Sequence, residues 1–192
     1  MFGSETLPTS ALALLGLLSI REMSGYELAA FADKSLGYFW PMHRSLVYRE
    51  LPRLEDAGYV AGTAVHQQRL PDKRVYRLTD AGRRRLTEWM ATPGFESPRY
   101  RNEFLVKFFF ARLISPEALR QLLVEYREAL ELDLTDLHAT VRKLDDNPDG
   151  LFGQLAARHG VHTRQAMLAW ISEVEDVLDR GIAATSRENN DR

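Results

Sequence analysis

The sequence predicts a mainly α-helical protein with one small β-hairpin, arranged as two domains joined by a linker. Apolar residues recur at helical spacing over most of the 192-residue chain. Two short segments, 59–66 and 73–79, are instead rich in β-branched and aromatic residues, which is typical of paired strands. Residues 92–101 contain two prolines and a glycine, the composition of a linker. The predicted parts are a helix-and-hairpin domain (1–91), the linker (92–101), a helical domain (102–185) and a flexible tail (186–192).

Two helices are predicted at the start of the N-terminal domain. The apolar run 11–20 follows Pro8-Thr9-Ser10, so a Ser or Thr hydroxyl is expected to cap a central packing helix. Ser24 and Glu27 have the spacing of a capping box, which predicts the start of a second helix. The predicted apolar face of that second helix consists of Tyr26, Leu28 and Phe31.

A third helix, over residues 42–57, is the element around which this domain is organised. Val47, Leu51 and Leu54 recur at spacings of four and three and form its apolar stripe. Gly58 follows the stripe directly and is expected to end the helix in a left-handed conformation. The opposite face near the helix start carries the polar and cationic residues His43, Arg44, Ser45, Tyr48 and Arg49.

Two features beside this stripe leave alternatives open. Pro52 removes one helical N–H group, so we expect the helix to bend near its middle, with a break at 50–52 as the alternative. The aromatic segment Tyr38-Phe39-Trp40 is interpreted as a hydrophobic plug between helices. The alternative for this segment is a stacking surface for bases or for a planar effector.

Positive charge gathers around the third helix and the hairpin. Residues 41–88 contain ten Lys and Arg against six Asp and Glu, a net charge of +4, whereas residues 89–192 have a net charge of −4. This asymmetry favours a polyanionic partner for the N-terminal domain, with chance clustering on solvated faces as the alternative. Thr79 is expected to cap a helix over 80–90, whose Arg83-Arg84-Arg85 triplet either reaches phosphates or forms a solvated face.

A helix with a cationic N-terminal face followed by a basic hairpin is the outline of a winged helix-turn-helix domain, which binds DNA. Arg44 is the first candidate for reading guanine, because its guanidinium fork matches O6 and N7. The hairpin cations are expected to bind the DNA backbone or minor groove and to set affinity. The alternative function is a protein–protein module whose basic residues contact an acidic partner without DNA. The predicted hairpin contacts are Arg69, Lys73 and Arg74.

Three helical segments are predicted in the C-terminal domain. The first, over 104–114, is strongly apolar and is expected to be packed on most sides. Ser115-Pro116 starts the second, an amphipathic rod of about 45 Å whose apolar stripe needs a partner. The last helix carries a similar stripe, so we predict a homodimer joined by these helices. The predicted dimerisation residues are Leu119, Leu123, Tyr126, Leu130, Leu134, Leu137, Val141, Leu144, Met167, Trp170, Ile171 and Val174.

The sequence offers little chemistry for an enzyme, a cofactor or a metal site, and none of these is predicted. It contains no cysteine, which excludes disulfides and thiolate ligands and fits a reducing cytoplasm. No Walker, GxGxxG, GxSxG or HExxH pattern occurs. His159 and His162 lie three residues apart, but no third ligand has suitable spacing. The longest apolar run has ten residues, too short to span a membrane, and no membrane partner is predicted.

With both halves in view, the chain resembles the PadR family of transcriptional regulators over roughly residues 10–180. The N-terminal motifs are moderately specific, and the pairing of Lys107–Ala111 with the late Trp170 is more discriminating. Arg49 stands where many relatives have a proline, and the loop 67–72 lacks their glycines. The matching segments are Leu14–Ser19, Ser24–Leu28, Ser45–Val60, Lys73–Gly82, Glu103–Glu117, Leu122–Leu130 and Ala169–Asp176.

The resemblance implies a homodimeric, repressor-like regulator that presents two recognition helices to a pseudo-palindromic DNA operator. Two linked modules suit half-sites about one helical turn apart. A small-molecule effector is also expected, in an aromatic crevice between the two halves of the chain, with core packing of the same residues as the alternative. The candidate crevice residues are Trp89, Phe104 and Phe108, together with Phe95 and Tyr100.

Overall fold

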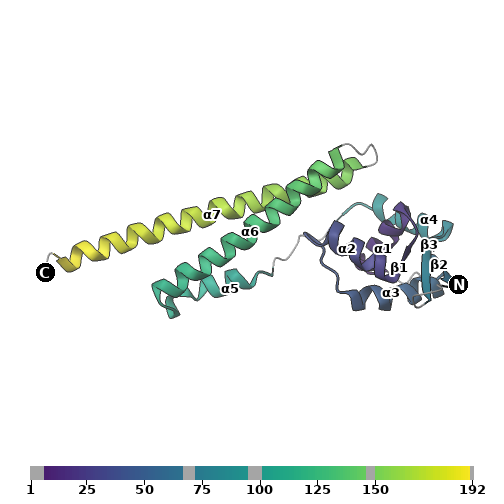
Figure 1. Cartoon of the computed structure of the whole chain (residues 1–192), viewed down its shortest axis with the longest axis horizontal. Coiled ribbons are helices and arrows are strands. Elements are labelled where there is room, and N and C mark those ends of the chain that lie inside the picture. The colour runs from purple at the N-terminus through teal and green to yellow at the C-terminus, as the bar shows by residue number, and fades with distance from the viewer. Residues whose placement is uncertain (1–6, 67–71, 95–100, 146–149, 191–192) are drawn as a thin grey trace. The chain divides into compact units, whose positions relative to one another are not determined.

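The computed structural model describes residues 7–66, 72–94, 101–145 and 150–190, with side chains described as far as Arg180. The chain divides into two compact units, Met1–Ser97 and Pro98–Arg192 (Figure 1). Within the described ranges, no helix is both long and apolar enough to cross a membrane.

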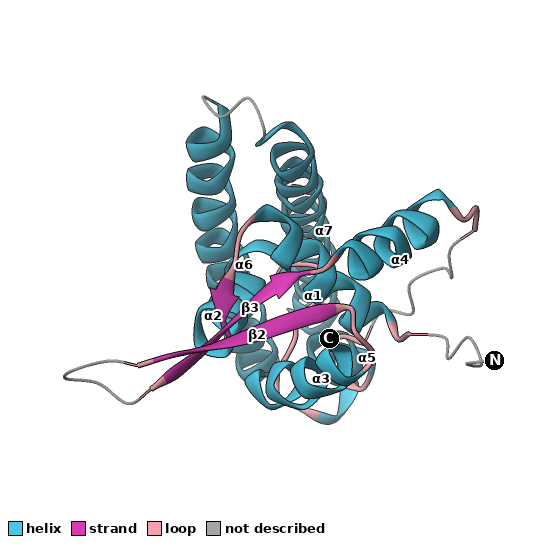
Figure 2. Cartoon of the chain, turned by 90° about the vertical axis from the view of Figure 1, so that its right-hand side faces the viewer, coloured by secondary structure: helices cyan, strands magenta, loops and turns pink. Residues whose placement is uncertain are grey.

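The first unit consists of four helices and a three-stranded antiparallel sheet. In Figure 2, the hairpin of the two longer strands extends beyond the helices of this unit. The elements are α1 (Thr9–Ile20), β1 (Met23–Ser24), α2 (Gly25–Leu36), α3 (Arg44–Asp56), β2 (Val60–Val65), β3 (Lys73–Leu78) and α4 (Asp80–Ala91).

Helix α1 is the centre of this unit, as predicted from its apolar sequence. Its start differs from the prediction, because Pro8 is the N-cap residue and no side chain caps the helix. Thr9 and Ser10 are already helical, so their hydroxyls are past the position from which they could accept the free N–H groups. Its buried side chains are Ala11, Leu12, Leu14, Leu15, Leu17 and Leu18.

Helix α2 begins at the predicted capping box, with the hydroxyl of Ser24 and the carboxylate of Glu27 each satisfying the other's backbone N–H. Leu28 and Phe31 of its predicted apolar face pack in or against the core, but the prediction is wrong for Tyr26, which is 61% exposed. Leu28 and Ala32 face the core one turn apart, and Tyr26 lies about 200° around the helix from Leu28. The core-facing residues of α2 are Gly25, Leu28, Ala29 and Ala32.

Helix α3 keeps its predicted stripe and its predicted end. Val47, Leu51 and Leu54 are at most 1% exposed, and Gly58 has a φ of 75°, the left-handed conformation that ends the helix. Pro52 lies inside one continuous helix with an exposed side chain, so the alternative of a break at 50–52 is wrong.

The aromatic segment before α3 does not form the predicted plug. Phe39 is 51% exposed and Trp40 is 41% exposed. The backbone N–H groups of both residues donate to the carbonyl of Leu36 in a turn that carries these rings to the surface of the unit.

The sheet contains one strand that the sequence did not predict. Strand β1 pairs with β3, with Met23 opposite Tyr76, and the strand order is β1-β3-β2. A two-residue strand has no period that a sequence pattern could detect. The predicted hairpin is present, with Val60 opposite Leu78 and Val65 opposite Lys73.

The second unit is a helical hairpin with a short helix packed on it. Helices α6 (Pro116–Asp145) and α7 (Leu151–Asn190) lie side by side and antiparallel (Figure 1). The helix expected over 104–114 is shorter, because α5 (Glu103–Phe109) is followed by a 3-10 turn (Ala111–Leu113). The tail expected from residue 186 is helical as far as Asn190.

The apolar stripe of α6 has its partner within the same chain. Leu123, Leu130 and Leu137 are at most 5% exposed because they pack in the interior of the α6–α7 hairpin, and Ile171 of α7 is fully buried. The premise that the apolar stripe of α6 has no partner within its own chain is therefore wrong. The predicted residues that are half-buried are Leu119, Tyr126, Leu134, Val141, Leu144, Met167, Trp170 and Val174.

One group of exposed apolar side chains of the second unit lies on α5 and the turn after it, and others are scattered along α6 and α7. The prediction that this segment is packed on most sides is wrong, because only Phe104 of α5 is buried. Phe109 is 79% exposed and Leu113 is 70% exposed. The exposed apolar residues here, named the α5 patch, are Leu105, Val106, Phe109, Phe110, Leu113 and Ile114.

Candidate nucleic-acid interface

The predicted recognition residues share the exposed face of α3 and its N-cap. The buried stripe fixes the rotation of this helix about its own axis, and the other face is left to solvent over its first two turns. This arrangement offers hydrogen-bond donors and positive charge at the end of a rigid helix. The exposed residues of this face are His43, Arg44, Ser45, Tyr48 and Arg49.

The two arginines of this face differ in how they are held. The Nε of Arg49 donates to the carboxylate of Glu50 at 3.0 Å, and Arg53 lies 3.6 Å from the same carboxylate. Glu50 is only 4% exposed, and a buried carboxylate requires such partners. Arg44 lies instead over the ring of Tyr26, with 5.2 Å between its Cζ and the ring centroid.

The hairpin cations are tied to the helices of the same unit. The Nη2 of Arg74 donates to Glu55 Oε1 at 2.6 Å, its Nε donates to Glu55 Oε2 at 3.1 Å, and the Gly62 N–H joins the same carboxylate. Gly62 leaves room for this bridge, since a Cβ there would lie 2.3 Å from Arg74 Nε. Lys73 Nζ lies 3.5 Å from Glu27. Arg69 lies outside the described residues.

These bridges assign an anchoring role to Arg74 that charge alone did not reveal. The hydrogen bond from Arg74 lowers the pKa of Glu55, and the same bond raises the pKa of Arg74, so both groups stay charged at neutral pH. Through its two hydrogen bonds to Glu55, the guanidinium of Arg74 holds the hairpin against the C-terminal end of α3.

We expect Arg74→Ala to leave the salt dependence of DNA binding unchanged, because its guanidinium is engaged by Glu55 rather than by phosphate. Removal of a phosphate contact would make the negative slope of log K against log salt shallower by about 0.9. Glu55→Gln is the matched variant, since it frees Arg74 and should steepen that slope. A shallower slope in Arg74→Ala would return this residue to the interface.

Glu27 connects the start of α2 to the hairpin. The hydroxyl and N–H of Ser24 donate to its carboxylate at 2.6 and 2.8 Å, and with Lys73 nearby these bonds lower the pKa of Glu27 from 4.5 to about 2. A carboxylate with a lowered folded-state pKa stabilises the fold above its ordinary pKa. This contribution is lost as the pH falls from 4.5 toward about 2.

Thermal unfolding of the wild type and of Glu27→Gln should show this dependence. The wild type should have the higher melting temperature above pH 4.5, and the difference should shrink as the pH approaches 2. A difference that stays constant over this range would show that ionisation of Glu27 does not contribute.

Two of the residues predicted to form an effector crevice, Phe104 and Phe108, pack together in the second unit. Phe104 is buried and stacks on Tyr126 with 3.8 Å between ring centroids, and Phe108 meets Trp170 edge to face at 5.3 Å. Both belong to the core of the second unit, so the alternative of core packing is confirmed for Phe104. Trp89 lies on α4 of the first unit and is 38% exposed. Phe95 and Tyr100 lie outside the described residues.

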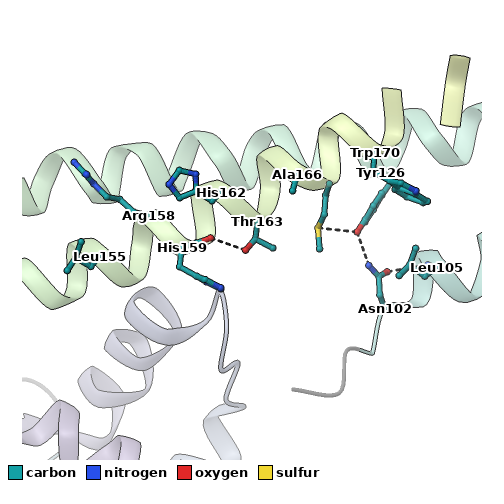
Figure 3. A pocket seen from close by; sticks show the side chains of 11 residues that line it. Asn102, Leu105, Tyr126, Leu155, Arg158, His159, His162, Thr163, Ala166 and Trp170 are labelled. Atoms are coloured by element: carbon teal, nitrogen blue, oxygen red, sulfur yellow. Dashed lines mark hydrogen bonds between the residues drawn. The ribbon is translucent and has the colours of Figure 1, made fainter. Parts of the chain in front are cut away.

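A groove beside this aromatic core was not predicted. It has a volume of about 1150 Å³ and lies among the start of α5, α6 and α7 (Figure 3). Two of its lining residues are joined, since the side-chain amide of Asn102 donates to the hydroxyl of Tyr126 at 2.8 Å. The helical spacing of His159 and His162 is the only sequence signal for it. The lining residues are Asn102, Leu105, Tyr126, Leu155, Arg158, His159, His162, Thr163, Ala166, Met167 and Trp170.

Two families match the two units. Residues 14–88 match the transcriptional regulator PadR-like family, and residues 100–179 match the family described as virulence activator alpha C-term. A probable transcriptional regulator of Mycobacterium tuberculosis (strain ATCC 25618 / H37Rv), Rv1176c, is 31% identical over 189 residues, which cover 86% of this chain and 95% of that protein. The negative transcriptional regulator PadR of Bacillus subtilis (strain 168) is 26% identical over 175 residues, covering 88% and 96%.

Solved structures of the Bacillus subtilis regulator have the same fold. Its complex with operator DNA has a TM-score of 0.75 at 26% identity, covering 87% of this chain and 97% of that one. Its complex with p-coumaric acid has a TM-score of 0.66 at 25% identity, covering 88% and 94%. The winged helix-turn-helix fold, the match of both units and these relatives agree, and the chain belongs to the PadR-like family of transcriptional regulators as a DNA-binding regulator rather than an enzyme.

Proposed function

We propose that this protein is a homodimeric repressor that binds a pseudo-palindromic operator with the exposed face of α3 in the major groove. The observation that carries the proposal is the exposed, cationic start of α3. It faces solvent because the apolar stripe on the other side of the helix is buried, and a hairpin flanks it. The relative from Bacillus subtilis is named a negative regulator and was crystallised with operator DNA, which supports repression. The cytoplasm, where operator DNA lies, is the proposed compartment.

Within this face, base reading is assigned to Arg44, with His43 and Ser45 beside it. The guanidinium of Arg44 can donate two parallel hydrogen bonds to guanine. Arg49 is directed toward Glu50, so its contribution is mainly electrostatic. Tyr48 is 52% exposed, which leaves its hydroxyl free to donate to a phosphate, the role proposed for it.

A second copy of the chain is the proposed cover for the α5 patch. Large apolar side chains that gather on one surface mark an interaction site. Light scattering should give about twice the 22.0 kDa mass of one chain. Phe109→Asp combined with Leu113→Asp should shift the protein to monomer, because a charge in a dry interface is costly. A double variant that remains a dimer would place the interface elsewhere.

A small aromatic effector is proposed for the groove of the second unit. Its wall combines the rings of Tyr126 and Trp170 with Arg158 and two histidines, a setting that suits a planar ligand with an anionic group. The p-coumaric acid complex of the Bacillus subtilis relative supports this class. Calorimetry with p-coumaric acid should show binding that Arg158→Ala and Trp170→Ala weaken. No heat of binding with this probe would exclude it as the effector.

Footprinting of the DNA upstream of the protein's own gene tests the operator proposal. A dimer of winged helices should protect two half-sites on one side of the duplex, about one helical turn or a multiple of it apart. Protection of a single half-site would contradict the dimeric arrangement, and absence of any protected region would contradict binding to this operator.

A further inference from the structure

We propose that Tyr26 is a specificity-determining positioning residue, whose ring holds the guanidinium of Arg44 in place to read a base. The inference rests on the proposed function of α3 and adds a residue of α2 to it. Tyr26 is 61% exposed although its neighbours Leu28 and Ala29 are buried, so packing of the core does not explain this ring.

The two side chains come from different helices and meet at the recognition face. Arg44 is the first residue of α3, and its Cζ lies 5.2 Å from the centroid of the Tyr26 ring in the first turn of α2. A guanidinium within about 6 Å of a ring centroid is attracted by the negative face of the ring.

The backbone beneath this pair is held rigidly. The capping box between Ser24 and Glu27 fixes the first turn of α2, and Ser24 is only 6% exposed. At Gly25 the two helices approach closely, since a Cβ there would lie 2.9 Å from Cε1 of Tyr48 and 3.3 Å from Cδ1 of Leu51. Tyr26 is therefore presented to α3 from a fixed position.

An aromatic ring and a carboxylate hold an arginine side chain in different ways. Arg49 donates its Nε–H to Glu50, and Arg74 donates two N–H groups to Glu55, so each guanidinium is paired with a carboxylate. Among the described residues, the ion pairs of the first unit do not include Arg44. Contact with a ring restricts the rotamers of Arg44, yet it leaves the in-plane N–H fork available for the bidentate contact to guanine. Less conformational entropy is then lost on binding.

Substitutions of Tyr26, alone and combined with Arg44→Ala, separate positioning from other roles of this ring. The test compares the affinities of the wild type, Tyr26→Phe and Tyr26→Leu for the footprinted operator and for a scrambled duplex. Tyr26→Leu should lower the ratio of the two affinities by roughly 3- to 30-fold, with little change on the scrambled duplex. Tyr26→Phe keeps the ring and should retain the wild-type ratio. In the Arg44→Ala background, Tyr26→Leu should have no further effect.

The matched control is Arg21→Ala, which removes the other guanidinium–ring pair formed by a residue outside the sheet. The Cζ of Arg21 lies 5.6 Å from the centroid of the Phe31 ring, and neither residue belongs to α3. Loss of Arg21 should therefore not change the ratio of operator to scrambled-duplex affinity. Circular dichroism confirms that each variant is folded before binding is measured.

Each other outcome overturns the inference. An unchanged ratio in Tyr26→Leu would show that the ring does not position Arg44. Equal weakening on both duplexes in Tyr26→Phe and Tyr26→Leu would assign the hydroxyl to a phosphate contact. A wild type that does not prefer the operator would instead refute the proposed function, and this failure is seen before any variant is tested.

Discussion

Arg44→Ala is expected to weaken operator binding by about 1–3 kcal/mol and to relax the preference for one base pair. The side chain lies on the exposed face at the start of α3, and its guanidinium is held by a ring rather than by a carboxylate. Binding to operators substituted at single positions, measured by fluorescence anisotropy, should show the lost preference at one position of each half-site.

Arg53→Ala provides the control for charge in the same helix. Arg53 is an exposed arginine in the last turn of α3 and lies 3.6 Å from the carboxylate of Glu50. Its loss should weaken binding to all sequences alike through the long-range field. If Arg44→Ala also weakens every sequence equally, Arg44 contacts phosphate and base reading belongs to another residue.

Gly82→Ala is expected to destabilise the first unit by about 1–3 kcal/mol or more, because the added methyl group has no room. A Cβ at Gly82 would lie 2.1 Å from the carbonyl oxygen of Tyr59 and 2.8 Å from Cδ1 of Leu78. The position cannot shift freely, since the Gly82 N–H donates to Thr79 Oγ1 and the Thr79 N–H donates to Tyr59. Urea unfolding measures the loss in the free energy of unfolding.

Gly16→Ala tests the same substitution where space is available. Gly16 lies within α1, and beyond its chain neighbours and the local helix backbone no heavy atom would come within 4 Å of its Cβ. The fold should gain about 0.5–1 kcal/mol, since alanine favours a helix over glycine. A Gly82→Ala protein as stable as the wild type would contradict the close approach of Gly82 to the carbonyl oxygen of Tyr59.

Local signals in the sequence predicted the elements that carry the proposed DNA interface. The stripe of Val47, Leu51 and Leu54 is set by helical spacing within one element, and the capping box of Ser24 and Glu27 spans three residues. Such patterns are complete within one stretch of sequence. They located α3 and its exposed face without knowledge of the remaining chain.

Contacts between distant residues account for what the sequence did not predict. Charge counting found Lys73 and Arg74, but their partners Glu27 and Glu55 are 46 and 19 residues away. Periodicity predicted that the stripe of α6 needs a partner, yet it cannot distinguish α7 of the same chain from a second copy. Tyr26 is predicted on the apolar face of α2 because the ring is apolar, but the type of a residue does not define which side of a helix is covered.

Fluorescence anisotropy of the wild-type protein on two duplexes tests the DNA-binding assignment most directly. One duplex carries the sequence upstream of the protein's own gene, and the other carries the same bases in scrambled order. We expect binding to the first to be tighter by roughly 1,000-fold or more near physiological salt, with log K falling linearly as log salt rises. Equal affinity for both duplexes at every salt concentration would contradict sequence-specific recognition by α3.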